Sequence, residues 1–385
     1  MVLWSPFPPE RFAAGDRRPR DFAIGLRAAG LSTVIFAPEG VSPRVSVTLN
    51  DPPVDHLGGN SFNRRSGISR LAYWWCVYRR CSQSRGAMLL FYNPPMLGAL
   101  CAFLLRCLGH LVVVEICDRF SLSESKGPFR RALHWLTEHT AVHSCNACIV
   151  ICSELASWVR RIAPGKRVAV VPVMVDLAMF RFESAQPREA KDRLSIATDS
   201  PIVVYAGSFH QEEGVAQLID AFAQIASHHP RVRLVLAGRH MATGQQLEGL
   251  HRCIERGAVE SSVVLPGFLE TSDLASLLLA ADVLALPQLD VPLNRSALPT
   301  KMAEYAAAGK AILATNVGDI SNYLVHGDSA FIVQDVSARG LALGLEALLS
   351  DPNLRLRLGT GARKVGLLMT PEQSVRRILN ELSGE

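Results

Sequence analysis

Strand-like and helix-like segments alternate along most of this sequence. Short apolar runs such as residues 202–205 and 233–237 are each followed by a stretch that favours a helix or a turn. Strands that alternate with helices predict parallel sheets with helices on both faces. Because the 385 residues exceed what one hydrophobic core usually spans, we expect an α/β protein of two doubly wound domains that face a central cleft.

The expected strands form two groups. Those of the first group cover residues 2–4, 32–36, 87–91, 110–116, 147–152 and 168–172. Those of the second group cover residues 202–205, 233–237, 262–265, 283–286, 311–314 and 330–333. Amphipathic helices are expected at residues 20–29 and from Gly214 onward. A polar, proline-containing stretch at residues 182–195 indicates the linker between the groups.

The two groups define the expected domains. They cover residues 1–183 and 184–365, and residues 366–385 are expected to form a C-terminal helix that packs back toward the first domain. Ligands of doubly wound sheets bind beyond the carboxyl ends of the strands. In the second domain these ends carry Gly207, Gly238, Pro287 and Thr315. We therefore expect a ligand site among the loops that contain these residues.

Cysteine usage and the apolar segments argue for a reduced, cytoplasmic protein. Nine cysteines without a basic and apolar leader favour free thiols over a disulfide framework. The apolar region 96–114 is broken by Arg106 and Gly109, which favours a buried helix and strand over a membrane span. Cys148 and Cys152 lie in an expected buried strand and no second Cys/His pair follows at ligand spacing, so we expect no metal site.

Charge is distributed unevenly. Residues 1–183 contain 22 Lys and Arg against 13 Asp and Glu, or +9, whereas residues 184–385 contain 18 against 22, or −4. Paired arginines such as Arg79–Arg80 and Arg130–Arg131 suit an anionic membrane face or a phosphate-bearing acceptor. The other interpretation is that they only keep the surface hydrated. No basic run interleaved with aromatic residues occurs, so we expect no nucleic-acid partner.

The segment at residues 127–140 allows two interpretations. Phe129, Leu133 and Trp135 recur at helical spacing beside Arg130 and Arg131. Such a helix either docks on a membrane surface or buries Trp135 in the domain core. Of these we favour burial of Trp135.

Residues 298–319 carry the strongest chemical signal. Lys301 and Glu304 stand in the first turns of an expected helix whose other residues are mostly small and apolar. A lysine near a helix N-terminus can bind phosphate together with the free backbone N–H groups. A carboxylate three residues later lies on the same face and can accept two sugar hydroxyls. This pattern predicts a nucleotide-sugar site; the alternative is a Lys301–Glu304 salt bridge on a solvated face.

The second half of the chain resembles the donor domain of the family-4 retaining glycosyltransferases, which have the GT-B fold. The matching segments, in order, are residues 205–208, 214–222, 234–239, 265–268, 281–287, 299–309 and 325–328. In the first half, residues 149–154 and 170–176 resemble the last strands before the family's linker. Residues 114–120 and Gly59-Asn60 with Arg64 or Arg65 resemble members that build exopolysaccharide and lipid-linked glycans. The resemblance implies two Rossmann-like domains around a cleft.

The resemblance also implies an activity. A sugar would pass from a nucleotide donor, UDP- or GDP-linked, to a glycan or polyprenyl-linked acceptor, with retention at the anomeric carbon and without a metal or other cofactor. Glu304 would bind the ribose, Lys301 and Arg295 would stabilise the leaving diphosphate, and Asp118 would lie on the acceptor side. The remaining donor-site candidates are Gly207, Ser208, Gly214, Arg239, Pro299 and Thr300. Such an enzyme would work in the cytoplasm, at the inner face of the membrane.

Three positions depart from the family pattern. Ser296 stands where the family has the first glutamate of a pair, and Ser208 and Glu213 stand where basic residues commonly bind the diphosphate. Lys301, Arg295 and Arg239 are the expected replacements for those bases.

These departures keep two other functions open. One is a sugar-nucleotide epimerase or hydrolase on the same fold, which would consume donor without an acceptor. The other is a catalytically inactive GT-B subunit that binds a partner or a nucleotide sugar without turnover. The sequence does not specify the donor base, the sugar or the acceptor.

Overall fold

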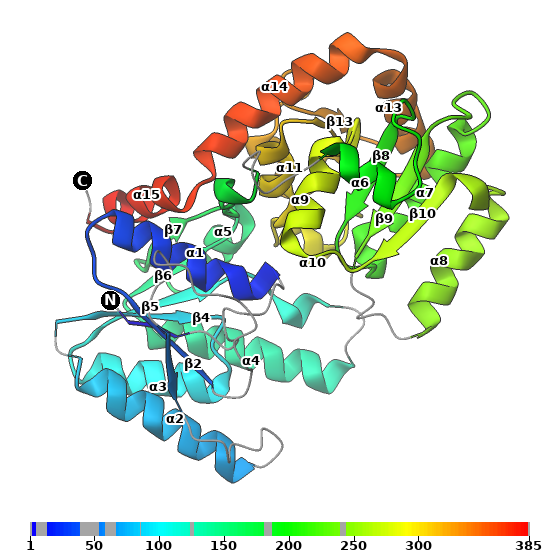
Figure 1. The fold of residues 1–385 in the computed structure, drawn as a ribbon. Helices are drawn as coiled ribbons and strands as arrows, with labels where there is room; N and C mark the ends of the chain where they lie inside the picture. The colour runs from blue at the N-terminus through cyan, green and yellow to red at the C-terminus, as the bar shows by residue number, and fades with distance from the viewer. Residues whose placement is uncertain are drawn as a thin grey trace. The chain divides into compact units, whose positions relative to one another are not determined.

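The computed structural model describes residues 2–4, 14–38, 54–57, 67–84, 86–123, 127–180, 187–238 and 244–383 (Figure 1). The chain forms two compact units. The first unit comprises Met1–Met174 and Thr370–Glu385, and the second comprises Val175–Met369. Each unit contains one parallel sheet.

The sheet of the first unit has the strand order β3-β2-β1-β4-β5-β6-β7. Its strands are β1 (Val2–Trp4), β2 (Val34–Pro38), β3 (Val54–Leu57), β4 (Met88–Tyr92), β5 (Leu111–Ile116), β6 (Ala147–Val150) and β7 (Arg167–Val170). All described pairings are parallel. The order reverses between β1 and β4, which is the point where doubly wound sheets place their ligand crevice.

Helices cover both faces of this sheet. They are α1 (Ala14–Ala28), α2 (Gly67–Ser82), α3 (Met96–Cys107), α4 (Pro128–Ser144), α5 (Ser153–Ile162) and α15 (Pro371–Ser383), with a short helix η1 (Phe120–Leu122). In Figure 1, α1 and α15 lie above the sheet and α2, α3 and α4 lie below it. The C-terminal helix α15 packs against α1 and β7, and it places Val375 and Ile378 in a core with Phe22 and Leu26 of α1.

The second unit has a sheet of order β10-β9-β8-β11-β12-β13. Its strands are β8 (Ile202–Ala206), β9 (Arg233–Ala237), β10 (Val263–Gly267), β11 (Val283–Leu286), β12 (Ala311–Thr315) and β13 (Phe331–Val333). The order reverses between β8 and β11, so the carboxyl ends of these two strands flank the crevice of this unit.

The helices of the second unit bury the sheet in the same way. They are α6 (Pro187–Arg193), α7 (Val215–Ile225), α8 (Gly244–Arg256), α9 (Thr271–Ala280), α10 (Pro292–Arg295), α11 (Lys301–Ala308), α12 (Ile320–Tyr323), α13 (Ala338–Ser350) and α14 (Pro352–Leu368), with the short helices η2 (Leu177–Phe180), η3 (Gln211–Glu213) and η4 (Glu260–Ser262). Helices α7 and α13 pack together, and α11 packs against α14. Leu218 and Phe222 of α7 meet Leu341 and Leu345 of α13 in the core over the sheet.

Most expected strands are confirmed, and the differences are local. Strand β3 and helix α2 were not predicted, and the helix expected at residues 20–29 begins at Ala14 and contains Pro19. The expected linker at 182–195 contains α6, with Pro187 at the first helical position, where its missing N–H costs nothing. The expectation that Trp135 is buried is wrong, because its side chain is 50% exposed.

We expect the C-terminal helix to stabilise the first unit through buried apolar contacts. Ile378→Ala should cost about 2–4 kcal/mol of unfolding free energy, as large-to-small core substitutions do, because Ile378 is buried among residues of α1 and the sheet. Urea unfolding followed by tryptophan fluorescence reports on this unit selectively, since all five tryptophans precede Met174.

The matched control is Arg377→Ala, at an exposed position of the same helix, which should change stability by less than about 0.5 kcal/mol. Equal effects of the two substitutions would contradict the packing role of α15.

Candidate functional site

The loop after β8 is held tightly against the neighbouring strand ends. The Gly207 N–H donates to the carbonyl of Ala237 at 3.0 Å, and the Gly238 N–H donates to that of Gly267 at 2.9 Å. A Cβ at Gly238 would lie 2.0 Å from the Gly207 oxygen, and one at Gly207 would lie 2.7 Å from Lys301 Nζ. A larger residue at position 238 would therefore clash with the Gly207 backbone, and one at position 207 would displace the ends of the Lys301 and Tyr205 side chains.

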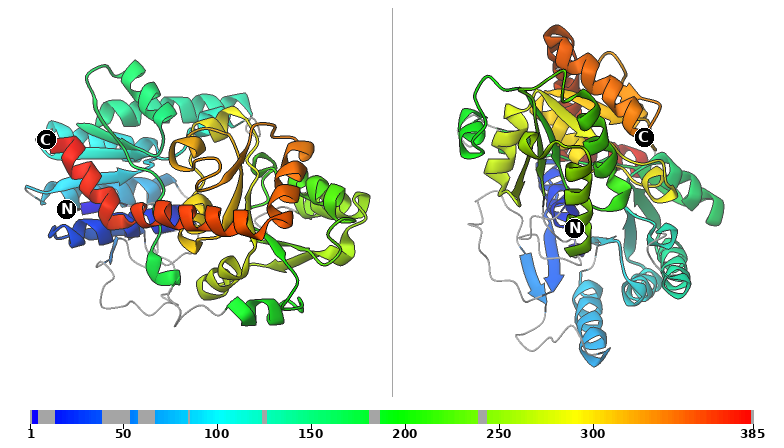
Figure 2. Two further views of the ribbon diagram at one scale, coloured as in Figure 1. Left: turned by 90° about the horizontal axis from the view of Figure 1, so that it is seen from above. Right: turned by 90° about the vertical axis from the view of Figure 1, so that its right-hand side faces the viewer.

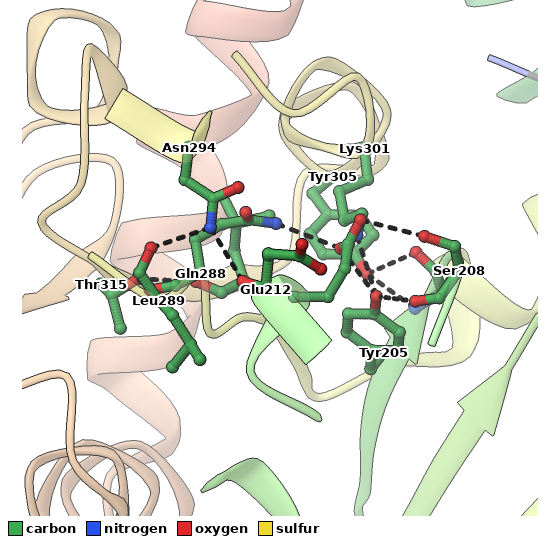
Figure 3. Close-up of polar contacts among 12 residues, drawn as sticks. Tyr205, Ser208, Glu212, Gln288, Leu289, Asn294, Lys301, Tyr305 and Thr315 are labelled. Atoms are coloured by element: carbon green, nitrogen blue, oxygen red, sulfur yellow. Dashed lines mark hydrogen bonds and ion pairs between the residues drawn. The ribbon is translucent and has the colours of Figure 1, made fainter. Parts of the chain in front are cut away.

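Lys301 begins helix α11 and is buried at this edge, with 7% of its surface exposed. Its ammonium group forms an ion pair with the Glu213 carboxylate and donates to Tyr205 Oη at 3.0 Å. It also lies 4.5 Å from the centroid of the Tyr205 ring, where a cation is attracted by the ring face. Figure 3 shows these contacts between α11, the end of β8 and the loop that follows it. The alternative interpretation, a Lys301–Glu304 salt bridge on a solvated helix face, is therefore wrong, because Lys301 is buried and pairs with Glu213.

The Glu213 carboxylate has further donors. It accepts hydrogen bonds from the Ser208 hydroxyl and the Gln288 side-chain amide, both at 3.1 Å. The Tyr205 hydroxyl shares its single proton between this carboxylate at 2.8 Å and the Ser208 carbonyl at 2.5 Å. Burial by itself would raise the pKa of Glu213, but the charge of Lys301 and the hydrogen bonds from Lys301, Tyr205 and Ser208 hold that pKa below its ordinary value. Burial, together with this carboxylate, raises the pKa of Tyr205 well above its ordinary value. The cluster is thus an ion pair between Lys301 and Glu213 with uncharged hydrogen-bond donors around it.

Side-chain amides and hydroxyls join the loops after β8, β11 and β12. Asn294 donates from Nδ2 to the carbonyls of Glu212 and Leu289, both at 2.8 Å. The Thr315 hydroxyl donates to the Gln288 carbonyl at 2.7 Å (Figure 3). The ends of β8, β11 and β12 are neighbours in the sheet. These hydrogen bonds hold their loops together as one polar surface beside the N-terminal end of α11.

Gly214 makes the turn from η3 into α7 possible. Its φ of 71° is in the left-handed region, and a Cβ there would lie 1.8 Å from the Pro287 carbonyl oxygen. Any other residue would have to adopt a strained backbone and also displace the loop after β11.

The other expected donor-site residues are placed differently. Arg295 ends α10 and is mostly exposed; its guanidinium donates two hydrogen bonds to the Asp290 carboxylate, at 2.6 and 2.9 Å. Pro299 and Thr300 directly precede α11, and Glu304 is half-buried in its first turn. Arg239 lies outside the described residues.

Ser296, at the position where the resemblance leads one to expect a glutamate, is buried and directly follows α10. Its hydroxyl donates to the Leu293 carbonyl at 3.0 Å.

Sequence reasoning missed two members of the cluster. Tyr205 was placed only in a strand, and Gln288 was not singled out. Two signals were available in the sequence. Tyr205 lies near the end of an otherwise aliphatic strand, and Gln288 follows Pro287, which comes directly after the next strand of the sheet.

In the first unit, the carboxyl end of β5 carries Asp118, which is half-buried. The adjacent Cys117 N–H donates to Asn93 Oδ1 at 2.9 Å. Arg18 of α1 forms a buried ion pair with Glu115 of β5 and donates to the carbonyls of Val171 and Pro172. Asp118 thus follows a rigid strand end that is joined to the end of β7.

The three neighbouring cysteines Cys145, Cys148 and Cys152 are buried free thiols. Cys145 and Cys148 lie with their sulfur atoms 3.5 Å apart, and both belong to the free cysteines of the chain. Among the residues that the structure describes, no three His, Cys, Asp or Glu side chains gather as metal ligands would.

Comparison with solved structures shows the fold of the chain. The structure is similar to a sucrose-phosphate synthase from Thermosynechococcus elongatus, with a TM-score of 0.78 and 18% identity over 100% of this chain and 98% of the other. It is also similar to Anabaena HepE in complex with UDP and glucose, with a TM-score of 0.77 and 17% identity over 100% and 99%. At this identity the likeness shows the fold alone, which is the expected GT-B fold with parallel α/β sheets.

Residues 187–365, which contain the whole cluster around Lys301, match the family described as glycosyl transferases group 1. A D-inositol 3-phosphate glycosyltransferase of Xylanimonas cellulosilytica is 31% identical over 238 residues, 59% of this chain and 54% of that protein. A glycogen synthase of Mycobacterium tuberculosis strain H37Rv is 27% identical over 202 residues, 52% and 44% of the two chains. The chain thus spans about half the length of these curated relatives.

We expect Gly214→Ala to destabilise the second unit by about 1–3 kcal/mol, the usual cost of a non-glycine residue in a strained backbone conformation. The displaced Pro287 carbonyl adds to this cost. Urea unfolding followed by far-ultraviolet circular dichroism measures the change.

Gly249→Ala in α8 is the matched control. A Cβ there meets no described atom within 4 Å, and alanine favours a helix over glycine by up to about 1 kcal/mol. If Gly214→Ala left the free energy of unfolding unchanged, the turn into α7 would not require glycine.

Proposed function

We propose that this protein is a retaining glycosyltransferase that uses a nucleoside diphosphate sugar as donor. The observation that carries the proposal is the N-terminal end of α11. There Lys301 and Glu304 lie in a unit whose residues 187–365 match the group 1 glycosyl transferases. The UDP and UDP-glucose complexes of Anabaena HepE, a structural neighbour, support a donor of this chemical class.

In this proposal the donor diphosphate lies at the N-terminus of α11. Its charge increases as the bond between the anomeric carbon and the phosphate oxygen breaks. Lys301, together with the positive end of the α11 dipole, would stabilise that charge more in the transition state than in the ground state. Arg295 would add a second cation by exchanging Asp290 for the diphosphate. We propose that these groups act without a resident metal ion or other cofactor.

Retention would follow if the acceptor attacks from the side on which the diphosphate leaves. The acceptor oxygen then bonds to the anomeric carbon while the departing phosphate oxygen takes the acceptor proton, so atoms and charge balance without a carboxylate nucleophile. Glu304 would accept hydrogen bonds from the ribose, Gly207, Ser208, Gly214, Pro299 and Thr300 would border the donor, and Asp118 would face the acceptor.

The acceptor in this proposal is a glycan or a polyprenyl-linked glycan. A panel of UDP- and GDP-sugars with and without such acceptors tests the activity. Acceptor-dependent release of nucleoside diphosphate supports transfer. Donor loss without acceptor would identify a hydrolase or epimerase, and donor binding without any turnover would identify an inactive binding subunit.

We expect Glu304→Gln to weaken donor binding or turnover by about 1.5–3 kcal/mol, the range for hydrogen bonds to a charged group. The substitution keeps the size of the side chain but removes its charge. Calorimetry with UDP and GDP, together with steady-state kinetics, measures the loss. Unchanged affinity and turnover would remove Glu304 from the donor site.

The first unit carries exposed apolar side chains on three neighbouring helices. We call them the apolar platform: Leu71 and Trp75 of α2, Leu100, Phe103, Leu104 and Leu108 at α3, and Phe129, Leu133 and Leu136 of α4. Their side chains are between 43% and 81% exposed, and they follow helical spacing on each element. Helix α3 packs against both α2 and α4, and Figure 2 shows the three helices in succession along one side of this unit.

The charges around the platform have one sign. Residues 56–114 contain seven arginines and no Asp or Glu. In α4, Arg130 and Arg131 are exposed, whereas the acid Glu138 is buried and accepts hydrogen bonds from Ser121. Large exposed apolar patches mark interaction sites, and an apolar face with arginines at its border fits the interface of an anionic bilayer.

We therefore propose that the platform docks on an anionic membrane surface and brings the enzyme to a lipid-linked acceptor, at the inner face of the cytoplasmic membrane. Within the described ranges no helix has the length and apolarity that crossing a bilayer would need. A peripheral contact of this kind combines burial of apolar side chains with attraction of arginines to anionic lipids.

Binding to vesicles separates these two contributions. Arg130→Glu with Arg131→Glu should weaken retention on anionic vesicles mainly at low salt, because each basic residue contributes about 1 kcal/mol and salt screens it. Phe129→Ser with Leu133→Ser should remove the part that persists at high salt, since it reduces the apolar area available for burial. Cosedimentation with vesicles of phosphatidylglycerol and phosphatidylcholine measures both.

Leu356→Ser is the matched control, because Leu356 is 72% exposed on α14 of the other unit. Loss of vesicle binding in this control as well, or a wild-type protein that ignores anionic vesicles at low salt, would contradict docking through the platform and favour a soluble acceptor.

A further inference from the structure

Both cations expected to face the leaving diphosphate already have a carboxylate of this chain as partner. Arg295 pairs with Asp290 at the surface, where both side chains are about half exposed. Lys301 pairs with Glu213, and these side chains are only 8% and 21% exposed. The second pair is the stronger one electrostatically, because burial reduces the screening by solvent.

Glu213 does not depend on Lys301 alone. If Lys301 turned toward a bound anion, the Glu213 carboxylate would keep the hydrogen bonds from Ser208 and Gln288, and the one that Tyr205 shares with the Ser208 carbonyl. A carboxylate that retains several donors remains satisfied when one donor leaves. The cluster is therefore built so that Lys301 can exchange partners while Glu213 stays in place.

We propose that Glu213 sets the affinity of this site for the diphosphate group by acting as the internal counter-ion of Lys301. This inference rests on the proposed function, because it assumes that a nucleotide lies at the N-terminus of α11. A Lys301–Glu213 pair has no net charge, so it attracts an anion far less than an isolated lysine would.

The effect differs between donor and product. In a nucleoside diphosphate sugar the terminal phosphate is esterified, whereas the free nucleoside diphosphate has an additional ionisable oxygen and up to one more negative charge near neutral pH. The Glu213 carboxylate therefore weakens binding of the product more than binding of the donor. Glu213 is in this way a specificity-determining residue that favours release of the nucleoside diphosphate after transfer.

A series of variants tests the proposal by changing the charge of the pair in steps. The wild-type pair is neutral, Glu213→Gln leaves a net positive charge, Lys301→Gln leaves a net negative charge, and the double variant is neutral again. Affinity for UDP and GDP, measured by calorimetry, should be highest for Glu213→Gln, by about tenfold over wild type for one unit charge acting in a partly buried site. It should be lowest for Lys301→Gln and intermediate for the double variant. UDP-glucose should gain less than UDP from Glu213→Gln.

Glu212→Gln is the matched control. It removes the same charge one residue earlier in η3, and the ion pair of Lys301 is with Glu213 instead. We expect it to leave UDP affinity within about twofold of wild type, since a charge near the protein surface is largely screened.

The outcomes separate this inference from the proposed function. If wild type and all variants fail to bind UDP and GDP, the proposed function fails. If wild type binds but Glu213→Gln binds no more tightly, or the double variant binds as tightly as Glu213→Gln, the counter-ion role of Glu213 is wrong and the proposed function stands. If Glu213→Gln does not fold, as judged by circular dichroism, the test is the comparison between Lys301→Gln and the double variant. The inference then requires the double variant to bind UDP more tightly than Lys301→Gln does. Equal or weaker binding by the double variant overturns the inference.

Discussion

The ion pair between Lys301 and Glu213 joins the parts of the second unit that make its ligand edge. Lys301 belongs to the first turn of α11, and Glu213 belongs to the loop between β8 and α7. Tyr205 and Gln288 bring the ends of β8 and β11 into the same cluster. A buried pair of this kind contributes little net stability, because desolvation offsets the attraction. It therefore fixes how loop and helix meet more than it stabilises the fold.

Small residues behind α11 hold the pair in position. A Cβ at Gly366 of α14 would lie 2.5 Å from the Ala307 nitrogen, and one at Gly359 would lie 2.5 Å from the Gly309 oxygen. Arg363 donates a hydrogen bond to the Ala307 carbonyl from the same helix. Because α14 lies this close, α11 cannot shift without displacing backbone atoms. The first turn of α11, which carries Lys301, therefore stays beside the strand ends.

The sequence predicts the strands of the second unit well because they are short apolar runs bounded by glycine, proline or polar residues. It also predicts α11 and its two charged residues, since Gly309 ends the helix in a left-handed conformation that favours glycine. It does not predict the partner of Lys301. Glu213 is 88 positions away, and the contact depends on β8 lying beside β11 in the sheet.

Other misses have equally local causes. Strand β3 has only the sequence Val-Asp-His-Leu and lies at the sheet edge, so its apolar pattern is weak. The exposure of Trp135 could not be predicted from its position in an amphipathic helix. Helical spacing shows that apolar residues share a face, but it does not show whether that face meets the core or the solvent. Only the packing of α3 beside α4 decides this.

The return of α15 to the first unit affects the order in which the chain can assemble. The second unit is one continuous segment, Val175–Met369, whereas the first consists of two segments separated by the whole of the second. During synthesis on the ribosome, the second unit is therefore fully available before the core around Phe22 and Leu26 receives Val375 and Ile378. Until those residues emerge, that apolar surface of α1 stays uncovered and is open to chaperones.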